Sequence, residues 1–159
     1  MKNIVLYIQE KLHPSKFKKE NKYHYHPKDI NELKNLIEDR IKKEGNNCNL
    51  NDIDVSNIKS FSFLFYQKKL KGFNGDISEW DMSNAECLEA MFYCSDFNGD
   101  ISKWDVKNCN ILAAMFERSK FNRKEDLEKW DVNPNADMEG MFHVCPLENN
   151  TPSWYHEKN

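Results

Sequence analysis

FNGDISEWDMSNAECLEAMFYCSD (residues 73–96) is followed at once by FNGDISKWDVKNCNILAAMFERSK (residues 97–120). The two stretches align without a gap, so that Trp80 falls on Trp104 and each Met-Phe pair falls on the other. A fixed period of 24 residues is typical of repeat proteins, in which each unit buries its apolar face against its neighbours. The chain is therefore predicted to be a row of stacked units.

The same anchor residues recur on both sides of this pair. Met-Phe follows Trp by 11 residues in the pair, and the spacing from Trp130 to Met141 is the same. Upstream, DVSNIKSFSFLF (54–65) aligns with DMSNAECLEAMF (81–92), and Ile53 takes the tryptophan position. The sequence thus predicts a repeat domain over residues 46–159, with units 46–72, 73–96, 97–120 and 121–146 and a partial unit 147–154.

Each unit is expected to contain a short strand and a short helix. The segment 77–82 is too short for a helix and ends in a polar turn, so we interpret it as a strand. Leu88, Met91 and Phe92 have the spacing of one helical face, and Asn84 is a suitable helix N-cap. The expected fold class is an α/β repeat solenoid, with equivalent strands side by side in a parallel sheet.

Stacking would align equivalent residues of successive units in columns. We interpret the tryptophan column as core packing, although such a column is also a conceivable platform for sugars or bases. A second column consists of aspartates, which we interpret as caps of local turns: Asp54, Asp81, Asp105 and Asp131. The alternative is a calcium ladder, which needs six or more oxygen ligands, but the NGD turn occurs only twice.

The N-terminal part is divided into residues 1–27 and residues 28–45. In the first segment, an amphipathic stripe of apolar residues predicts a helix followed by a polar linker. This helix either packs on its own domain or docks a second partner or a membrane surface. The second segment predicts a helix, which Asp29 caps and Gly45 ends. We expect this helix to cover the open end of the stack.

We find no signal peptide, lipobox or apolar stretch long enough to span a membrane, so we expect a cytoplasmic protein.

The repeats resemble the BspA-type leucine-rich repeat family, also known as the mycoplasma-type lipoprotein repeat. Its pattern is similar to F-N-x-D-I-S-x-W-D-V-S-N-x-x-x-M-x-x-M-F, which units 73–96 and 97–120 match closely and the two flanking units match with insertions. The segment 32–54 resembles the helical lead-in of such repeats. The resemblance implies a leucine-rich-repeat-like solenoid that binds other macromolecules, without catalytic residues. Family members are often at the cell surface.

Charge and motifs narrow the classes of function. The net charge is −3, but residues 1–45 carry +4 and residues 46–159 carry −7, so a nucleic-acid surface is not expected. The five cysteines lie at different positions of their repeats without a CxxC motif, and we interpret them as small, mostly buried thiols. His24 and His26 form an H-x-H pair without a third metal ligand. We therefore expect no enzyme activity, no cofactor and no metal site.

The predicted function is a non-enzymatic protein–protein interaction module whose partner has a basic surface. The expected binding residues are the outward positions between the buried anchors: Ser78, Glu79, Asp81, Ser102, Lys103, Asp105, Glu128, Lys129 and Asp131. Charge reversal at Glu79 or Lys103 is expected to weaken binding without lowering the melting temperature.

Two alternatives stay open at this stage. The N-terminus resembles the openings of small proteins from gut bacteria and their phages, which suggests a phage-encoded inhibitor that blocks a host defence protein, such as a nuclease, with its acidic face. The other alternative is a structural or cargo component of a larger assembly, attached through residues 1–12.

Overall fold

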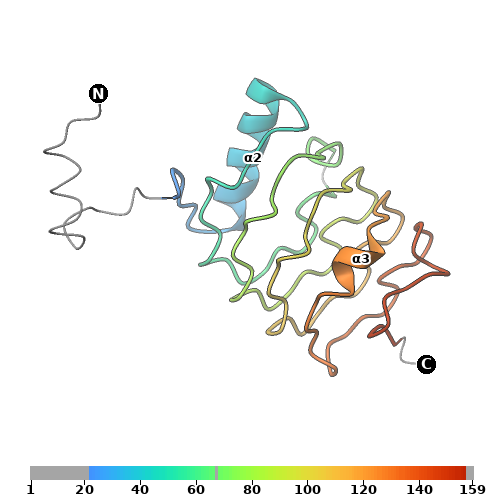
Figure 1. Ribbon diagram of the computed structural model, residues 1–159. Coiled ribbons are helices and arrows are strands. Elements are labelled where there is room, and N and C mark those ends of the chain that lie inside the picture. The colour runs from blue at the N-terminus through green and yellow to red at the C-terminus, as the bar shows by residue number, and fades with distance from the viewer. Residues whose placement is uncertain (1–21, 67, 157–159) are drawn as a thin grey trace, which may run out of the picture.

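The repeat units lie side by side in a row that begins at a helix. The computed structural model describes residues 22–66 and 68–156, in which the helices are α2 (Ile30–Glu44) and α3 (Lys124–Leu127). Figure 1 shows α2 at the N-terminal end of the row and the units following it toward the C-terminus. The amphipathic helix predicted within residues 1–27 falls mostly on positions outside the described residues. The docking role predicted for this helix concerns the same positions.

Helix α2 has the bounds that its sequence predicts. The Asp29 carboxylate accepts the backbone N–H groups of Asn31 and Glu32, at 2.8 and 2.9 Å, which satisfies two donors of the first turn. Gly45 ends the helix with φ +86°, in the left-handed region that glycine tolerates best. Leu33 and Ile37 are fully buried in the same core as the repeat units, so α2 packs against the first of them.

The predicted α/β solenoid is wrong. Among the described residues the units contain no strand, and their helix is limited to the four residues of α3. Successive units meet instead through isolated parallel bridges, such as Ser60 with Cys87, Cys87 with Ile111, and Ile111 with Asp137. The units are rows of tight turns, and neither a parallel sheet nor a leucine-rich-repeat-like layer of helices is present in this part of the chain.

Left-handed residues explain why the predicted helical turn does not form. Ala90 and Ala114 have φ values of 49° and 54°, and such a residue interrupts a right-handed helix. The N–H groups of alternate residues therefore point to the following unit: Leu88 donates to the Ile111 carbonyl at 2.9 Å and Ala90 to that of Ala113 at 3.0 Å. We call this series of inter-unit hydrogen bonds the turn ladder; it runs through residues 60–66, 86–94, 110–118 and 136–144.

The predicted strand at residues 77–82 is likewise a turn. The Trp80 N–H donates to the Ile77 carbonyl at 3.2 Å, three residues back, which closes the backbone on itself. Asn84, the predicted helix N-cap, donates its side-chain amide to the Ser56 carbonyl of the preceding unit at 3.0 Å. The Trp80 N–H thus closes a turn, and the Asn84 side chain links two neighbouring units.

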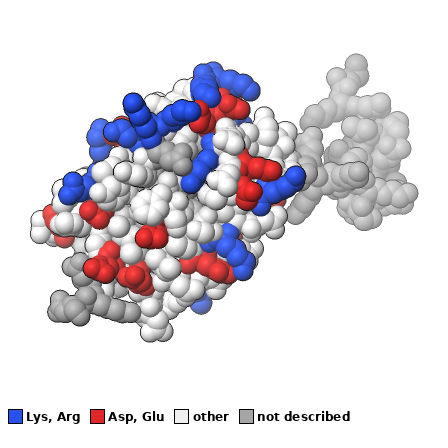
Figure 2. Space-filling view, turned by 180° about the vertical axis from the view of Figure 1, so that it is seen from behind, with Lys and Arg blue, Asp and Glu red and all other residues white. Residues whose placement is uncertain are grey.

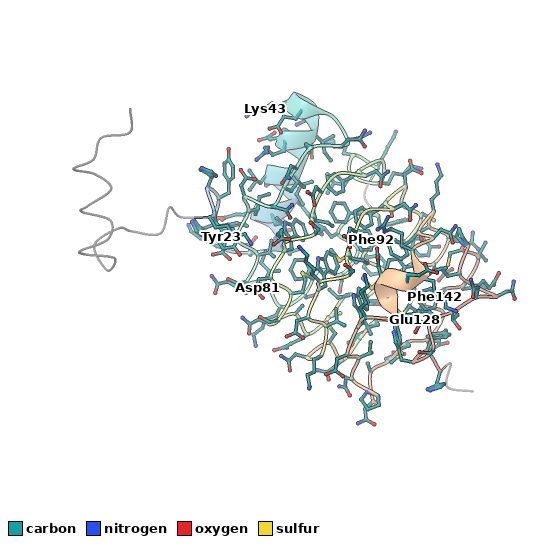
Figure 3. All side chains as sticks on the ribbon, viewed as in Figure 1. Tyr23, Lys43, Asp81, Phe92, Glu128 and Phe142 are labelled. Carbon is teal, nitrogen blue, oxygen red and sulfur yellow. The ribbon has the colours of Figure 1, made fainter. Side chains whose placement is uncertain are left out.

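Columns of aromatic rings form the core of the row. Phe65, Phe92, Phe116 and Phe142 stack in order, with ring centroids 5.3, 5.6 and 5.8 Å apart. Figure 3 shows Phe92 in the interior and Phe142 nearer the C-terminal end. The interpretation of the tryptophan column as core packing is confirmed, because Trp80, Trp104 and Trp130 are at most 5 % exposed. Each indole N–H donates to a carbonyl of the preceding unit, as Trp104 does to Ile77 at 3.1 Å.

Replacing Ala114 by glycine is expected to stabilise the protein by about 1 kcal/mol, because glycine removes the cost of the left-handed conformation at a half-buried position. Urea denaturation measures the change. Ala113, the half-buried neighbour without a positive φ, is the control: its replacement by glycine should destabilise by about 0.5–1 kcal/mol. Two changes of the same sign would contradict the role given to φ at residue 114.

Candidate functional site

The nine predicted binding residues lie in three successive units, at segments 76–81, 100–105 and 126–131. We call these segments the row face. Ser78 and Ser102 are half-buried, and the other predicted residues are exposed: Glu79, Asp81, Asp105, Lys103, Glu128, Lys129 and Asp131. Figure 3 labels Asp81 and Glu128, which belong to different units of this face. The residues are thus available to a partner, although they lie in turns and not in strands.

The aspartate column caps turns, as the sequence predicts. The Asp81 carboxylate accepts the Ser83 backbone N–H at 3.1 Å and its hydroxyl at 2.6 Å. Asp105 accepts the Lys107 N–H at 3.2 Å, and Asp54 plays the same part for Ser56. Asp131 departs from the pattern, because its carboxylate forms an ion pair with Lys107 at 3.0 Å. The column therefore fixes the backbone while its charges stay on the surface.

Glu79 and Lys103 pair with each other across the junction between two units. Their charged atoms lie 2.5 Å apart, and Lys22 approaches Glu79 at 3.8 Å. The hydrogen bond from Lys103 lowers the pKa of Glu79, and the same bond raises the pKa of Lys103. Reversing one of these charges alone would break this pair as well as any contact with a partner, so it does not isolate binding.

Two further carboxylates, Asp76 and Asp100, hold the row face in shape. Asp76 accepts the N–H and the hydroxyl of Ser78 at 3.0 and 2.8 Å, and Asp100 accepts the Ser102 N–H at 2.9 Å. The backbone hydrogen bond from Ser102 is the main cause of a lowered pKa at Asp100. Neither was predicted as a site residue, although the repeated NGD motif marks both positions.

Hydrogen bonds between units also fix the ends of the row face. The Glu79 N–H donates to the Asn51 side chain of the preceding unit at 2.9 Å. At the other end, the Glu128 carboxylate accepts the Ser153 hydroxyl at 2.6 Å and its N–H at 3.1 Å. Lys129 lies 3.9 Å from the Asp126 carboxylate. The side chains of this face are thus attached to a backbone with little freedom to move.

The row face is strongly acidic. Its three segments contain eight Asp or Glu residues, of which Asp126 is buried, and two Lys residues. On the side of the molecule turned away from the view in Figure 1, lysine and arginine gather along one margin and the acidic side chains lie mostly elsewhere (Figure 2). Such partial separation of charge favours partners of opposite sign on each surface.

The remaining candidates for chemistry are occupied by structural contacts. His26 lies 3.1 Å from the Asp54 carboxylate, and His24 lies 3.7 Å from that of Asp52. Cys48 and Cys109 are buried and the other three thiols half-buried, and burial raises the pKa of Cys109 to about 12. In the described ranges no three His, Cys, Asp or Glu side chains are grouped to hold a metal ion, and no helix is long and apolar enough to cross a membrane.

A family model described as "Mycoplasma protein of unknown function, DUF285" matches residues 18–155, which include α2 and every repeat unit. No curated protein and no solved structure matches the chain.

Proposed function

The chain belongs to the DUF285 family, and we propose that it is a non-enzymatic module that binds a basic surface of a protein partner through the row face. The observation that carries this proposal is the excess of acidic side chains on a backbone fixed by turn caps and inter-unit hydrogen bonds. A surface that is already ordered loses little conformational entropy on binding, which favours affinity. The resemblance to the BspA-type leucine-rich repeat family, which implies macromolecule binding, supports the same role.

Electrostatic complementarity is the proposed basis of recognition. Asp81 and Asp105 have no ion-pair partner among the described residues, so their charges are free to attract a basic surface. Interactions of this exposed kind are screened by salt over a distance of about 8–10 Å, so binding should weaken steeply as the salt concentration rises. The cation–anion contacts would add mainly to the association rate and to specificity.

Replacing Asp81, Asp105 and Asp131 by asparagine tests the proposal. Asparagine keeps an oxygen that caps the turn, as Asn49 and Asn133 already do in this chain for Asn51 and Asn135. The substitution therefore removes three charges and should leave the melting temperature within about 2 °C, since exposed charges contribute little to stability. We expect affinity for the partner to fall about tenfold and its salt dependence to flatten, at roughly 0.5 kcal/mol per charge.

The partner is first obtained by affinity capture from the native cell with mass spectrometry, and binding is then measured with the purified pair by calorimetry. The matched control removes three acidic charges outside the row face: Asp39→Asn, Glu89→Gln and Glu125→Gln. It should bind as the wild type does. Equal affinity of the wild type and the row-face variant would overturn the proposal.

A further inference from the structure

The last full unit, 121–146, contains backbone donors equivalent to those that every earlier junction uses. In the turn ladder, Leu112, Ala114 and Phe116 donate their N–H groups to the carbonyls of the following unit at 2.7–3.0 Å. The equivalent donors of the last unit are the N–H groups of Met138, Gly140 and Phe142. They donate to no residue in the ranges that the structure describes. We call residues 136–144 the open edge.

An edge of this kind is suited to bind another chain. Unpaired N–H groups in a regular row form a template on which an extended segment can add its own carbonyls. Gly140 is half-buried and Glu139 and His143 beside it are exposed, so this part of the edge can be reached from solvent. A hydrogen bond formed there with an arriving carbonyl contributes roughly 0.5–1.5 kcal/mol.

An apolar cavity lies beside the open edge. It has a volume of ≈ 260 Å³ and is lined by Val132, Pro134, Ala136, Met138, Trp154 and His156. Small-molecule sites usually measure about 300–1,000 Å³, so this cavity suits one side chain better than a free ligand. The core next to it is already closed by Tyr155, whose ring packs against Phe142 at 5.0 Å. What remains open is the row of donors and the cavity.

The charge around the open edge favours one kind of bound segment. Residues 132–156 contain Asp137, Glu139 and Glu148 and no Lys or Arg. All three acidic residues are exposed. A segment rich in lysine or arginine would therefore be attracted, and an acidic segment would be repelled.

We propose that the open edge binds a basic segment of a protein partner, which runs parallel to residues 136–144 and presents its carbonyls as the turn-ladder segments do, with one aliphatic side chain in the cavity. The junctions inside the chain use the same donors, so this contact continues an interface that the fold already builds three times. A second copy of the chain is the competing occupant of the open edge, and the experiment below separates the two. The site is separate from the row face, and neither proposal depends on the other.

A synthetic peptide of residues 109–120 is the probe, because it contains the turn-ladder segment whose carbonyls accept the N–H groups of residues 88–94 inside the chain. It carries Cys109→Ser to prevent oxidation and Glu117→Lys to make it basic. We expect the chain of residues 1–159 to bind it with a micromolar Kd and to bind the reversed sequence at least tenfold more weakly. Amide hydrogen exchange gives the direct readout: the amides of Met138 and Gly140 should exchange at least tenfold more slowly when the peptide is bound.

The variant Glu139→Lys places a positive charge on the open edge, where Glu139 has no ion-pair partner among the described residues. It should weaken peptide binding at least threefold without changing the melting temperature, whereas Glu125→Lys on α3 should change neither. The proposal is overturned if the reversed peptide binds equally well, or if the edge amides are as protected in the free protein as that of Ala114. It is also overturned if sedimentation shows a dimer that the peptide does not dissociate, since a second copy would then occupy the edge.

Discussion

Phe92→Ala is expected to lower the free energy of unfolding by about 4 kcal/mol, within the range of 3–5 kcal/mol for aromatic-to-alanine changes in a core. Phe92 is fully buried, and its ring stacks on four others: Phe65 at 5.3 Å, Phe97 at 4.4 Å, Phe116 at 5.6 Å and Trp104 at 6.2 Å. Phe65 comes from the preceding unit, and the other rings come from the following unit. The cavity left by alanine would therefore loosen two junctions at once, with few other contacts to compensate.

Urea denaturation followed by tryptophan fluorescence measures this loss. Phe63→Ala is the matched control, because Phe63 belongs to the same turn ladder but is 41 % exposed. It should cost less than about 1.5 kcal/mol, since much of its surface is already in water. A loss at Phe92 no larger than the loss at Phe63 would show that the ring column does not hold the units together.

The core and the N-terminal helix could be predicted because their signals are local and periodic. The spacing from Trp to Met-Phe places the same apolar residues in every unit, and burial of Trp80, Trp104 and Trp130 follows from it. Asp29 and Gly45 mark the ends of α2 by well-understood capping chemistry. The turn caps at Asp81 and Asp105 belong to the same class, because they involve residues two positions apart.

The secondary structure of the units could not be predicted, because tertiary contacts overrule the local preference. Alanine is the strongest helix former, and Leu88, Met91 and Phe92 have helical spacing. Even so, Ala90 is left-handed, because that conformation directs N–H groups to the next unit, where they find carbonyl partners. These carbonyl partners belong to the neighbouring unit, so the sequence of one unit does not show that they are present.

Of the candidate site, the exposure of its residues could be predicted, but the contacts between units could not. Exposure of Glu79, Lys103 and Asp131 follows from their place between buried anchors. The pairing of Glu79 with Lys103 depends on how far one unit is displaced from the next, which the sequence does not state. The open edge depends on where the last junction falls, so it becomes visible only when each N–H group is followed to its acceptor.

Gly75→Ala is expected to destabilise the protein by about 3 kcal/mol or more, near the upper end for overpacking. A Cβ atom at residue 75 would lie 2.0 Å from the Cys48 carbonyl oxygen and 2.7 Å from the Phe73 ring. The oxygen belongs to the backbone of the preceding unit, and it accepts the Asp76 N–H at 3.1 Å. It cannot move aside without breaking that hydrogen bond, so the whole junction has to separate.

Gly75, Gly99 and Gly140 differ in how close other atoms would lie to an added Cβ, so their alanine variants can be compared. At Gly99 the nearest backbone atom is 3.1 Å from the added Cβ, and at Gly140 nothing lies closer than 3.9 Å. Thermal denaturation should therefore rank the alanine variants Gly75 below Gly99 and Gly99 below Gly140 in melting temperature. Gly140→Ala should be tolerated best, because Ala90 and Ala114 already adopt its left-handed conformation. If Gly75→Ala melted as high as Gly140→Ala, close approach between units would not be the reason for glycine in the NGD motif.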